Sequence, residues 1–181
     1  MNFTLEIWRQ FDGGSESNNE GRFETFKVTD IDPEASILEM LDQLNERLSR
    51  DKKRTVAFDS DCREGICGAC SLVIDGTPHG PQQVTSCQTY MRDFIDGQTI
   101  KIEPFRASTF PVVRDLAVDR GALDRVIQAG GYISTTTGPQ PEPNAMPVSP
   151  EVQERAMDAA ICIGCGACVA ACPNGAAMLF T

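Results

Sequence analysis

Apolar side chains recur at every second position at the beginning of the chain, at Phe3, Leu5 and Ile7. This period of two predicts a β-strand over residues 3–8 with one buried face. Residues 13–21 are rich in Gly, Ser, Asn and Glu and are expected to form a turn or hairpin end. Residues 23–28 then supply the partner strand.

A helical period follows the first two predicted strands. Residues 37–48 carry apolar side chains at helical spacing, which predicts an amphipathic helix packed on a sheet. Short strands are expected at residues 55–58 and 71–74, a hairpin turn at Asp75-Gly76 and a closing strand at 99–103. This order predicts an α+β fold of the ubiquitin-like β-grasp type.

The second half has a different pattern. Residues 105–128 are expected to be rich in helix, with valine and leucine side chains for an apolar face. Residues 135–150 contain five prolines, so they cannot continue a helix or a central strand and are expected to form an extended strap. Ser149-Pro150 has the signature of a helix start, with serine at the N-cap and proline at the first helical position.

All eight cysteines fall into two groups of different spacing. The first group follows C-x4-C-x2-C…C, the plant-type spacing for a 2Fe-2S centre. The second group follows C-x2-C-x2-C-x3-C-P, the bacterial spacing for a 4Fe-4S centre. The first group is Cys62, Cys67, Cys70 and Cys87, and the second is Cys162, Cys165, Cys168 and Cys172, followed by Pro173. Two kinds of one-electron carrier in one chain indicate an electron-transfer protein.

Disulfides and zinc are the alternatives for eight cysteines. Disulfide frameworks are typical of short secreted chains, whereas residues 1–5 show no basic segment followed by an apolar run. We therefore expect a reducing, bacterial-type cytoplasm. Structural zinc usually takes two separated C-x2-C pairs or mixtures with histidine, and the only histidine, His79, lies outside both groups. His79 is expected to be a turn residue rather than a general base.

The loop from Cys62 to Cys70 has the composition that wrapping a cluster requires. Gly65 and Gly68 tolerate positive φ and allow backbone N–H groups to approach the sulfurs. Three acidic residues nearby would lower the reduction potential if they lie close to the centre. They are Asp59, Asp61 and Glu64, for which a solvated loop carboxylate is the alternative interpretation.

Charge excludes some function classes. The net charge of −10 belongs mainly to the first half and argues against a nucleic-acid partner, whose phosphates would be repelled. Residues 159–181 contain no charged side chain, but glycines, a proline and four cysteines interrupt them. We therefore do not expect this stretch to span a membrane.

Ligand counting suggests that the second group serves two centres. In two-cluster ferredoxins the first three cysteines of this spacing bind one cluster and the fourth binds the other. By that count Cys162, Cys165 and Cys168 give one cluster three of its four ligands and Cys172 gives a further centre one. The remaining ligands of both centres are missing, so we expect a truncated sequence. The alternative is a single 4Fe-4S cluster held by all four cysteines.

Four runs of sequence resemble the iron–sulfur subunit of succinate dehydrogenase and fumarate reductase: LEIWRQF, DCREGICGACSL, IKIEPFRASTFPVVRDLAVDR and CIGCGACVAACPNGAAMLF. The resemblance implies a β-grasp 2Fe-2S domain over residues 1–105 and an incomplete α-helical ferredoxin-like domain over 106–181. It implies that Cys62, Cys67, Cys70 and Cys87 hold 2Fe-2S, that Cys162, Cys165 and Cys168 hold 4Fe-4S, and that Cys172 contributes to 3Fe-4S.

The same resemblance implies the partners. Electrons would pass between an FAD-containing flavoprotein subunit and a quinone held by a membrane anchor, at the cytoplasmic face of a bacterial inner membrane. The chain itself contains no Ser-His-Asp set and no phosphate-binding glycine loop, so dicarboxylate oxidation would belong to the flavoprotein. The competing hypothesis is a free-standing soluble ferredoxin.

Overall fold

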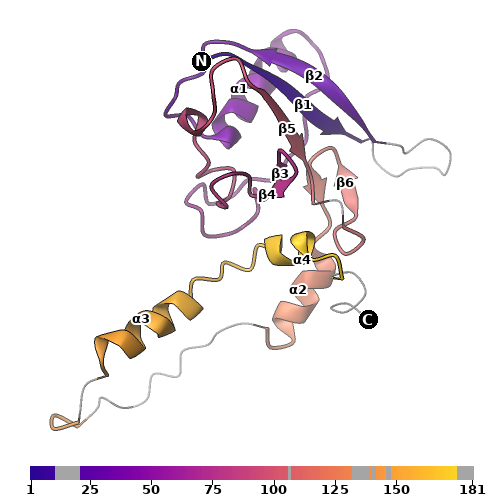
Figure 1. Ribbon diagram of the computed structural model, residues 1–181. Helices are drawn as coiled ribbons and strands as arrows, with labels where there is room; N and C mark the ends of the chain where they lie inside the picture. The colour runs from indigo at the N-terminus through magenta and orange to yellow at the C-terminus, as the bar shows by residue number, and fades with distance from the viewer. Residues whose placement is uncertain (11–20, 106, 132–138, 140–141, 146–147, 175–181) are drawn as a thin grey trace.

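The computed structural model describes residues 1–10, 21–105, 107–131, 139, 142–145 and 148–174. A five-stranded sheet with one long helix forms the upper part of the molecule, and three short helices lie below it (Figure 1). The turn predicted at 13–21, apart from Gly21, and half of the proline-rich strap at 135–150 lie outside the described residues. The candidate functional site lies on the cysteine loops below the sheet.

The sheet has the strand order β2-β1-β5-β3-β4. Its strands are β1 (Phe3–Arg9), β2 (Arg22–Val28), β3 (Val73–Ile74), β4 (Thr77–Pro78) and β5 (Thr99–Glu103). The central pair, β1 and β5, is parallel, with Leu5 beside Ile100, and the other pairs are antiparallel. The alternation seen in the sequence is the alternation of burial, because Phe3, Leu5 and Ile7 are all buried. The predicted α+β class and β-grasp are confirmed.

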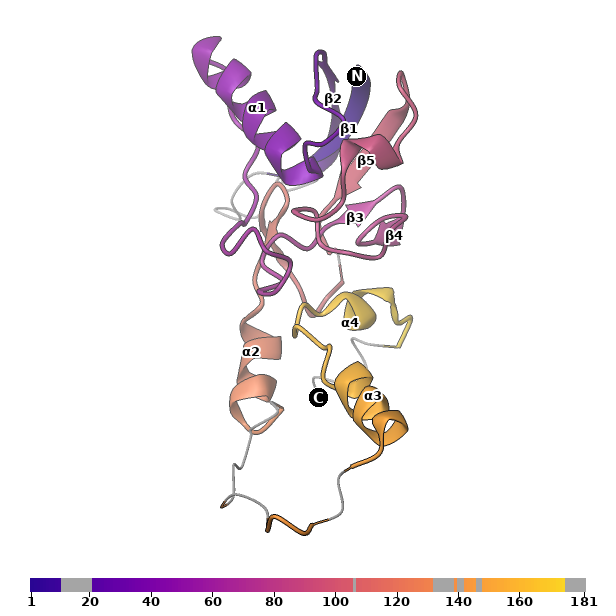
Figure 2. The ribbon, with the colours of Figure 1, turned by 90° about the vertical axis from the view of Figure 1, so that its left-hand side faces the viewer.

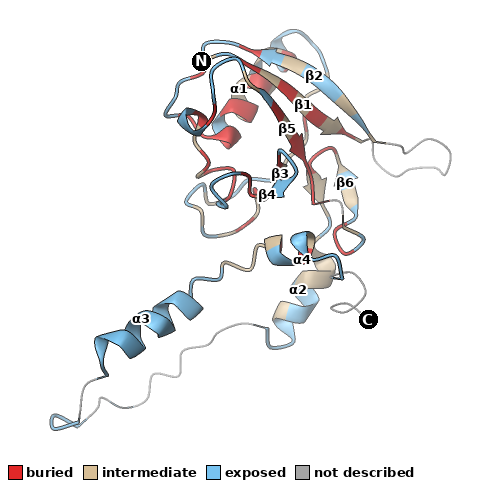
Figure 3. Ribbon diagram, viewed as in Figure 1, coloured by how far each residue is buried: buried red, intermediate tan, exposed pale blue. Residues whose placement is uncertain are grey.

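Helix α1 (Ile37–Arg50) covers one face of this sheet (Figure 2). It begins with a capping box, in which Ser36 Oγ accepts from Glu39 N at 3.2 Å and Glu39 Oε2 accepts from Ser36 N at 2.7 Å. Glu39 Oε2 also accepts from Ser36 Oγ at 2.9 Å. The hydrogen bonds that the carboxylate accepts from the Ser36 backbone, first, and from the Ser36 hydroxyl lower the pKa of Glu39. Its buried face consists of Ile37, Leu38, Met40, Leu41, Leu44 and Leu48. Burial is concentrated between this helix and the sheet (Figure 3).

Two of the expected short strands differ from the prediction. Residues 55–58 form no strand, because both backbone groups of Val56 bond to the Asn45 side chain of α1, each at 2.8 Å. The strand expected at 71–74 contains only Val73 and Ile74. Ser71 instead donates its hydroxyl to Gly68 O at 2.6 Å and so belongs to the cysteine loop.

The helix-rich interpretation of residues 105–128 is wrong for its first part. Two short strands, β6 (Val112–Arg114) and β7 (Ala117–Val118), form a hairpin, and helix α2 is limited to Gly121–Gln128. Asp115 turns the hairpin with a positive φ of 48°, a conformation that a helix cannot contain. Valine-rich β-strands and helices share apolar composition, so composition alone did not separate them.

The Asp115 carboxylate holds this hairpin against the sheet domain. It is fully buried and accepts hydrogen bonds from Gln10 N at 3.1 Å, from Ala57 N at 3.0 Å and from Arg54 Nη2 at 3.0 Å. Arg9 Nη1 lies 3.5 Å from its second oxygen. One carboxylate therefore connects β1, the segment after α1 and the β6–β7 hairpin.

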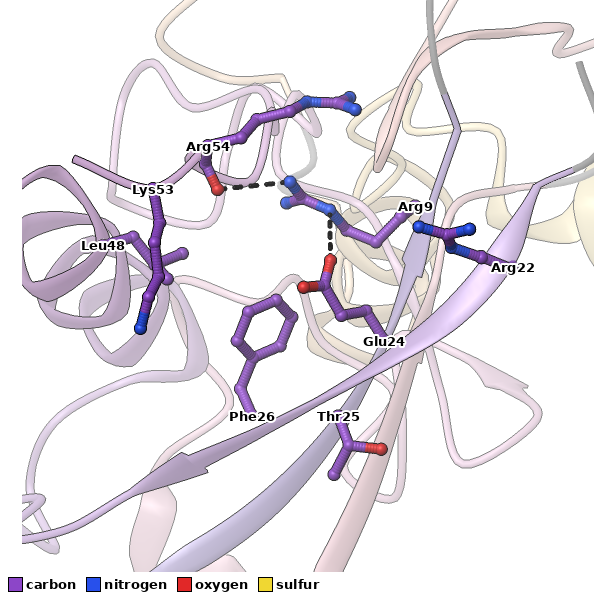
Figure 4. Close-up of a pocket in the computed structure, with 8 residues that line it drawn as sticks. All are labelled: Arg9, Arg22, Glu24, Thr25, Phe26, Leu48, Lys53 and Arg54. Carbon is purple, nitrogen blue, oxygen red and sulfur yellow. Dashed lines mark hydrogen bonds and ion pairs between the residues drawn. The ribbon is translucent and has the colours of Figure 1, made fainter. Parts of the chain in front are cut away.

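Arg9 also borders a cavity of about 490 Å³ on this side of the sheet (Figure 4). Its guanidinium donates to Arg54 O at 3.3 Å, and Nε lies 3.2 Å from Glu24 Oε2. Burial lowers the pKa of Arg9, whereas Asp115 and Glu24 raise it. The buried positive charge of Arg9 is therefore balanced by the carboxylates of Glu24 and Asp115.

The lower part contains helices α2, α3 (Pro150–Ala159) and α4 (Ala167–Ala171). Helix α3 starts at Pro150 after an extended Ser149, as predicted, and its residues are exposed (Figure 3). Helix α4 packs beneath the sheet through Val169, which forms a small apolar cluster with Phe105 and Phe110. No helix in the described part of the chain is long and apolar enough to cross a membrane.

His79 is the turn residue that the sequence predicts, directly after β4, and its side chain is buried. Its φ of 66° is that of a turn, while its ring stacks on Phe105 with 6.1 Å between ring centres. Its Nε2 lies 3.1 Å from Ser71 Oγ. Burial lowers the pKa of His79 and outweighs a hydrogen bond with the Gln83 backbone, which raises it.

A pH-dependent stability follows from His79. Protonation favours the unfolded chain, where histidine titrates near about 6.5. The stabilisation is therefore complete above that pH and is lost as the pH falls toward the lower folded-state value. We expect His79→Gln to reduce the fall in the free energy of unfolding between pH 7.5 and 5.5, by at most about 1.4 kcal/mol for each unit of pKa difference. Melting curves of both proteins at the two pH values measure this change. Parallel pH profiles of the two proteins would contradict this expectation.

Candidate metal centre

The first three cysteines lie on a loop that wraps around their sulfur atoms. Gly65 and Gly68 adopt positive φ values of 72° and 71°, as their place in the loop predicted. Glu64 N donates to Cys62 Sγ at 3.3 Å, and Ala69 N donates to Cys67 Sγ at 3.4 Å. Backbone N–H groups aimed at sulfur are a recognised determinant of cluster potential.

The four thiols of this group form two pairs. The Cys67 side chain hydrogen-bonds to Cys62, and the Cys87 side chain hydrogen-bonds to Cys70. Hydrogen bonds from the Glu64 backbone first, then from Ile66, lower the pKa of Cys62 to about 7. Burial raises the pKa of Cys70, which packs with Cys87 against Leu38. One pair therefore faces the surface and the other the core.

Cys87 is brought to the loop by the segment that precedes it. Ser86 donates its hydroxyl to Cys70 O at 2.8 Å, and Thr85 Oγ1 lies 3.3 Å from Cys87 Sγ. Both hydroxyls are buried, so water does not replace these contacts. They fix the distant fourth cysteine beside the first three.

The pairing fits a binuclear centre. A 2Fe-2S cluster takes four cysteines, two on each iron. Within the ranges that the structure describes, no three His, Cys, Asp or Glu side chains converge as they would around a single metal ion. The predicted acidic neighbours Asp59, Asp61 and Glu64 are all exposed, as the solvated alternative required.

The second cysteine group lies on the loop before α4 and on the helix itself. Cys165 is half-buried and accepts from Ala167 N at 3.5 Å, while the other three are exposed. Gly164 and Gly166 have positive φ values of 65° and 83°. A Cβ on Gly166 would lie 2.7 Å from Phe110 Cζ, so glycine allows the loop to pack on the apolar cluster.

The two cysteine loops touch each other. A Cβ added to Gly68 would lie 2.7 Å from Cys165 Cβ. Arg120 donates to Gly68 O in the first loop and to Gly164 O in the second. A cavity of about 490 Å³ is lined by both Cys67 and Cys162. The fold therefore brings together cysteines that are about a hundred positions apart in sequence.

The family of 2Fe-2S iron–sulfur cluster binding domains matches residues 4–125. The chain belongs to this family. A 4Fe-4S binding domain matches residues 156–178, so each cysteine group of this 2Fe-2S family member falls within a domain of the predicted cluster type.

Relatives of known function are iron–sulfur subunits. The succinate dehydrogenase iron–sulfur subunit of Bacillus subtilis is 37% identical over 130 residues, which cover 68% of this chain and 46% of that protein. The fumarate reductase iron–sulfur subunit of Wolinella succinogenes is 30% identical over 154 residues, covering 83% and 58%. The chain spans about half the length of the curated relatives it matches. The predicted resemblance to these subunits is confirmed.

A solved structure has the same fold. A chain of the Mycobacterium smegmatis Sdh1 complex in the apo form superimposes with a TM-score of 0.67 at 26% identity, covering 97% of this chain and 65% of the other. The sequence prediction missed two residues of this 2Fe-2S family member that matter for its geometry, Arg120 and Asp115. Both lie in the run RDLAVDR, which contributed to the resemblance but carried no assigned roles.

Proposed function

We propose that this chain is the electron-transfer subunit of a succinate dehydrogenase or fumarate reductase. The observation that carries the proposal is the contact between two cysteine loops of different cluster spacing, at Gly68 and Cys165. Bound iron–sulfur clusters would supply one-electron acceptance and donation at these loops. Similarity to iron–sulfur subunits of both enzymes supports the assignment.

The ligand assignment is part of this proposal. Residues 1–105 would form the 2Fe-2S domain, and residues 106–181 the helical ferredoxin-like domain. The paired thiols Cys62, Cys67, Cys70 and Cys87 would hold 2Fe-2S, Cys162, Cys165 and Cys168 would hold 4Fe-4S, and Cys172 would give one ligand to a 3Fe-4S centre. Its position as the exposed C-cap of α4, turned out of the helix with a ψ of 122°, supports a separate role for Cys172.

The other residues of the loops hold and tune these sites. Glu64 N and Ala69 N direct backbone N–H groups at Cys62 Sγ and Cys67 Sγ, where they would stabilise the negative charge of a bound cluster. Leu38 and Phe58 exclude water from the Cys70–Cys87 pair. Buried Ser86 and Thr85 keep Cys87 in place for metal binding.

The proposed partners are an FAD-containing flavoprotein subunit and a quinone-binding membrane anchor. Both follow from the relatives, which are named as subunits of larger enzymes. The chain would lie at the cytoplasmic face of a bacterial inner membrane, held there by the anchor.

The test uses the chain purified without oxygen and then combined with a flavoprotein subunit of this enzyme class. We expect iron and acid-labile sulfide in the protein, an EPR signal of a reduced 2Fe-2S centre, and reduction of that centre by succinate only when the flavoprotein is present. Iron-free protein containing zinc would refute the proposal. A 2Fe-2S centre that is present but is not reduced by succinate and the flavoprotein would instead favour a free-standing ferredoxin.

A further inference from the structure

Arg120 connects the two cysteine loops. It donates from Nη1 to Gly68 O at 2.9 Å and from Nη2 to Gly164 O at 2.6 Å. Gly68 follows Cys67 directly, and Gly164 precedes Cys165. A planar guanidinium presents its donors in a rigid fork, so two hydrogen bonds from one side chain fix both distance and orientation. The charge of Arg120 strengthens each of them.

The loops meet where the first loop has no room for a side chain. The position of a Cβ on Gly68 would be 2.7 Å from Cys165 Cβ and 2.8 Å from Cys165 Cα, and its φ of 71° also favours glycine. This contact places the residue that follows Cys67 directly against Cys165.

Arg120 faces the same space as the candidate ligands. It lines the cavity of about 490 Å³ whose walls include Cys67 on one side and Cys162 on the other. Arg120 also lies at the N-cap position of α2, just after the β6–β7 hairpin that Asp115 holds to the sheet domain. The guanidinium is thus tied to the sheet through the β6–β7 hairpin, and it reaches the loop of the second cysteine group.

We infer that Arg120 is a positioning residue that fixes the spacing between the two iron–sulfur centres and so controls electron transfer from one to the other. The inference rests on the proposed function, because it concerns centres assigned there. Apart from this clamp, α4 meets the first domain through a small apolar cluster around Phe110 and Val169. Loss of the fork leaves the second loop held by non-directional contacts, which do not specify a distance.

The experiment compares the full chain with Arg120→Gln, Arg120→Lys and the control Arg125→Gln. Arg125 is exposed on α2, the helix that Arg120 precedes as N-cap, and its replacement removes the same charge. The first readout, which needs no cluster, is amide hydrogen exchange over residues 162–168. The second is the magnetic interaction between the reduced centres in EPR, which depends on their separation.

We expect Arg120→Gln to lower protection of residues 162–168 by roughly tenfold, the equivalent of about 1.4 kcal/mol, and to weaken the magnetic interaction at unchanged iron content. Arg120→Lys should retain part of both, because lysine keeps the charge without the fork. Arg125→Gln should match the parent chain.

Three outcomes would overturn the inference. The first is that amide exchange and the magnetic interaction are both unchanged in Arg120→Gln. The second is that Arg120→Gln and Arg125→Gln change them equally. The third applies if Arg120→Gln does not fold, and it is that Arg120→Lys leaves the magnetic interaction unchanged. A parent chain without paramagnetic centres would instead refute the proposed function, and the exchange comparison would still report on the clamp.

Discussion

We expect replacement of Cys87 by alanine to abolish the EPR signal of the 2Fe-2S centre proposed for this chain. Cys87 is buried beside Cys70 against Leu38, so water cannot enter to take the vacant ligand position. Thr85 and Ser86 hold the backbone there through buried hydroxyl contacts, which prevents another segment from moving in. The measurement is signal intensity per chain in the reduced protein, with iron determined on the same sample.

Cys172→Ala is the matched control for this prediction. Cys172 is exposed at the end of α4, in the group with the other spacing. Its replacement should leave the 2Fe-2S signal intact while changing any signal from the second group. Loss of the 2Fe-2S signal in both variants would show that the two cysteine groups do not bind separate centres.

Asp115→Ala lowers the free energy of unfolding by about 3–5 kcal/mol, the usual cost of removing one partner from a buried ion pair. The substitution leaves Arg9, whose side chain is only 4% exposed, with Glu24 as its remaining carboxylate. It also leaves the backbone N–H groups of Gln10 and Ala57 without their acceptor. For a chain of this length the melting temperature should fall by roughly 10 °C.

Glu46→Ala is the matched control, because Glu46 forms an ion pair with Arg50 at the surface of α1. An exposed pair of this kind is worth no more than about 1 kcal/mol. Calorimetry of both variants and the parent chain measures the difference. Equal losses in the two variants would show that the Asp115 network contributes no more than a surface contact.

The first domain could be predicted from sequence because local patterns and tertiary structure agree there. Alternation at Phe3, Leu5 and Ile7 and the helical stripe on α1 each had one interpretation, and both became the core. The cysteine spacing identified the loop, and Gly65 and Gly68 adopt the backbone angles that such a loop requires. These features depend on residues close together in sequence.

The errors occurred where distant side chains replace local bonds. Val56 is held by the Asn45 amide instead of a neighbouring strand, and Asp115 ends a would-be helix by bonding to Gln10 and Ala57. The bridge from Arg120 to Gly68 and Gly164 likewise spans about fifty positions in each direction. Periodicity cannot detect such long-range contacts.

The parallel pairing of β1 with β5 links folding of this chain to its synthesis. Thr4 lies beside Thr99 and Ile7 beside Ile102, so the first strand waits for nearly a hundred further residues before it gains its central neighbour. Pairing over such a distance is slow because a long loop must close first. We therefore expect the proposed cluster to enter the first cysteine group late, once β5 has been synthesised and has paired with β1.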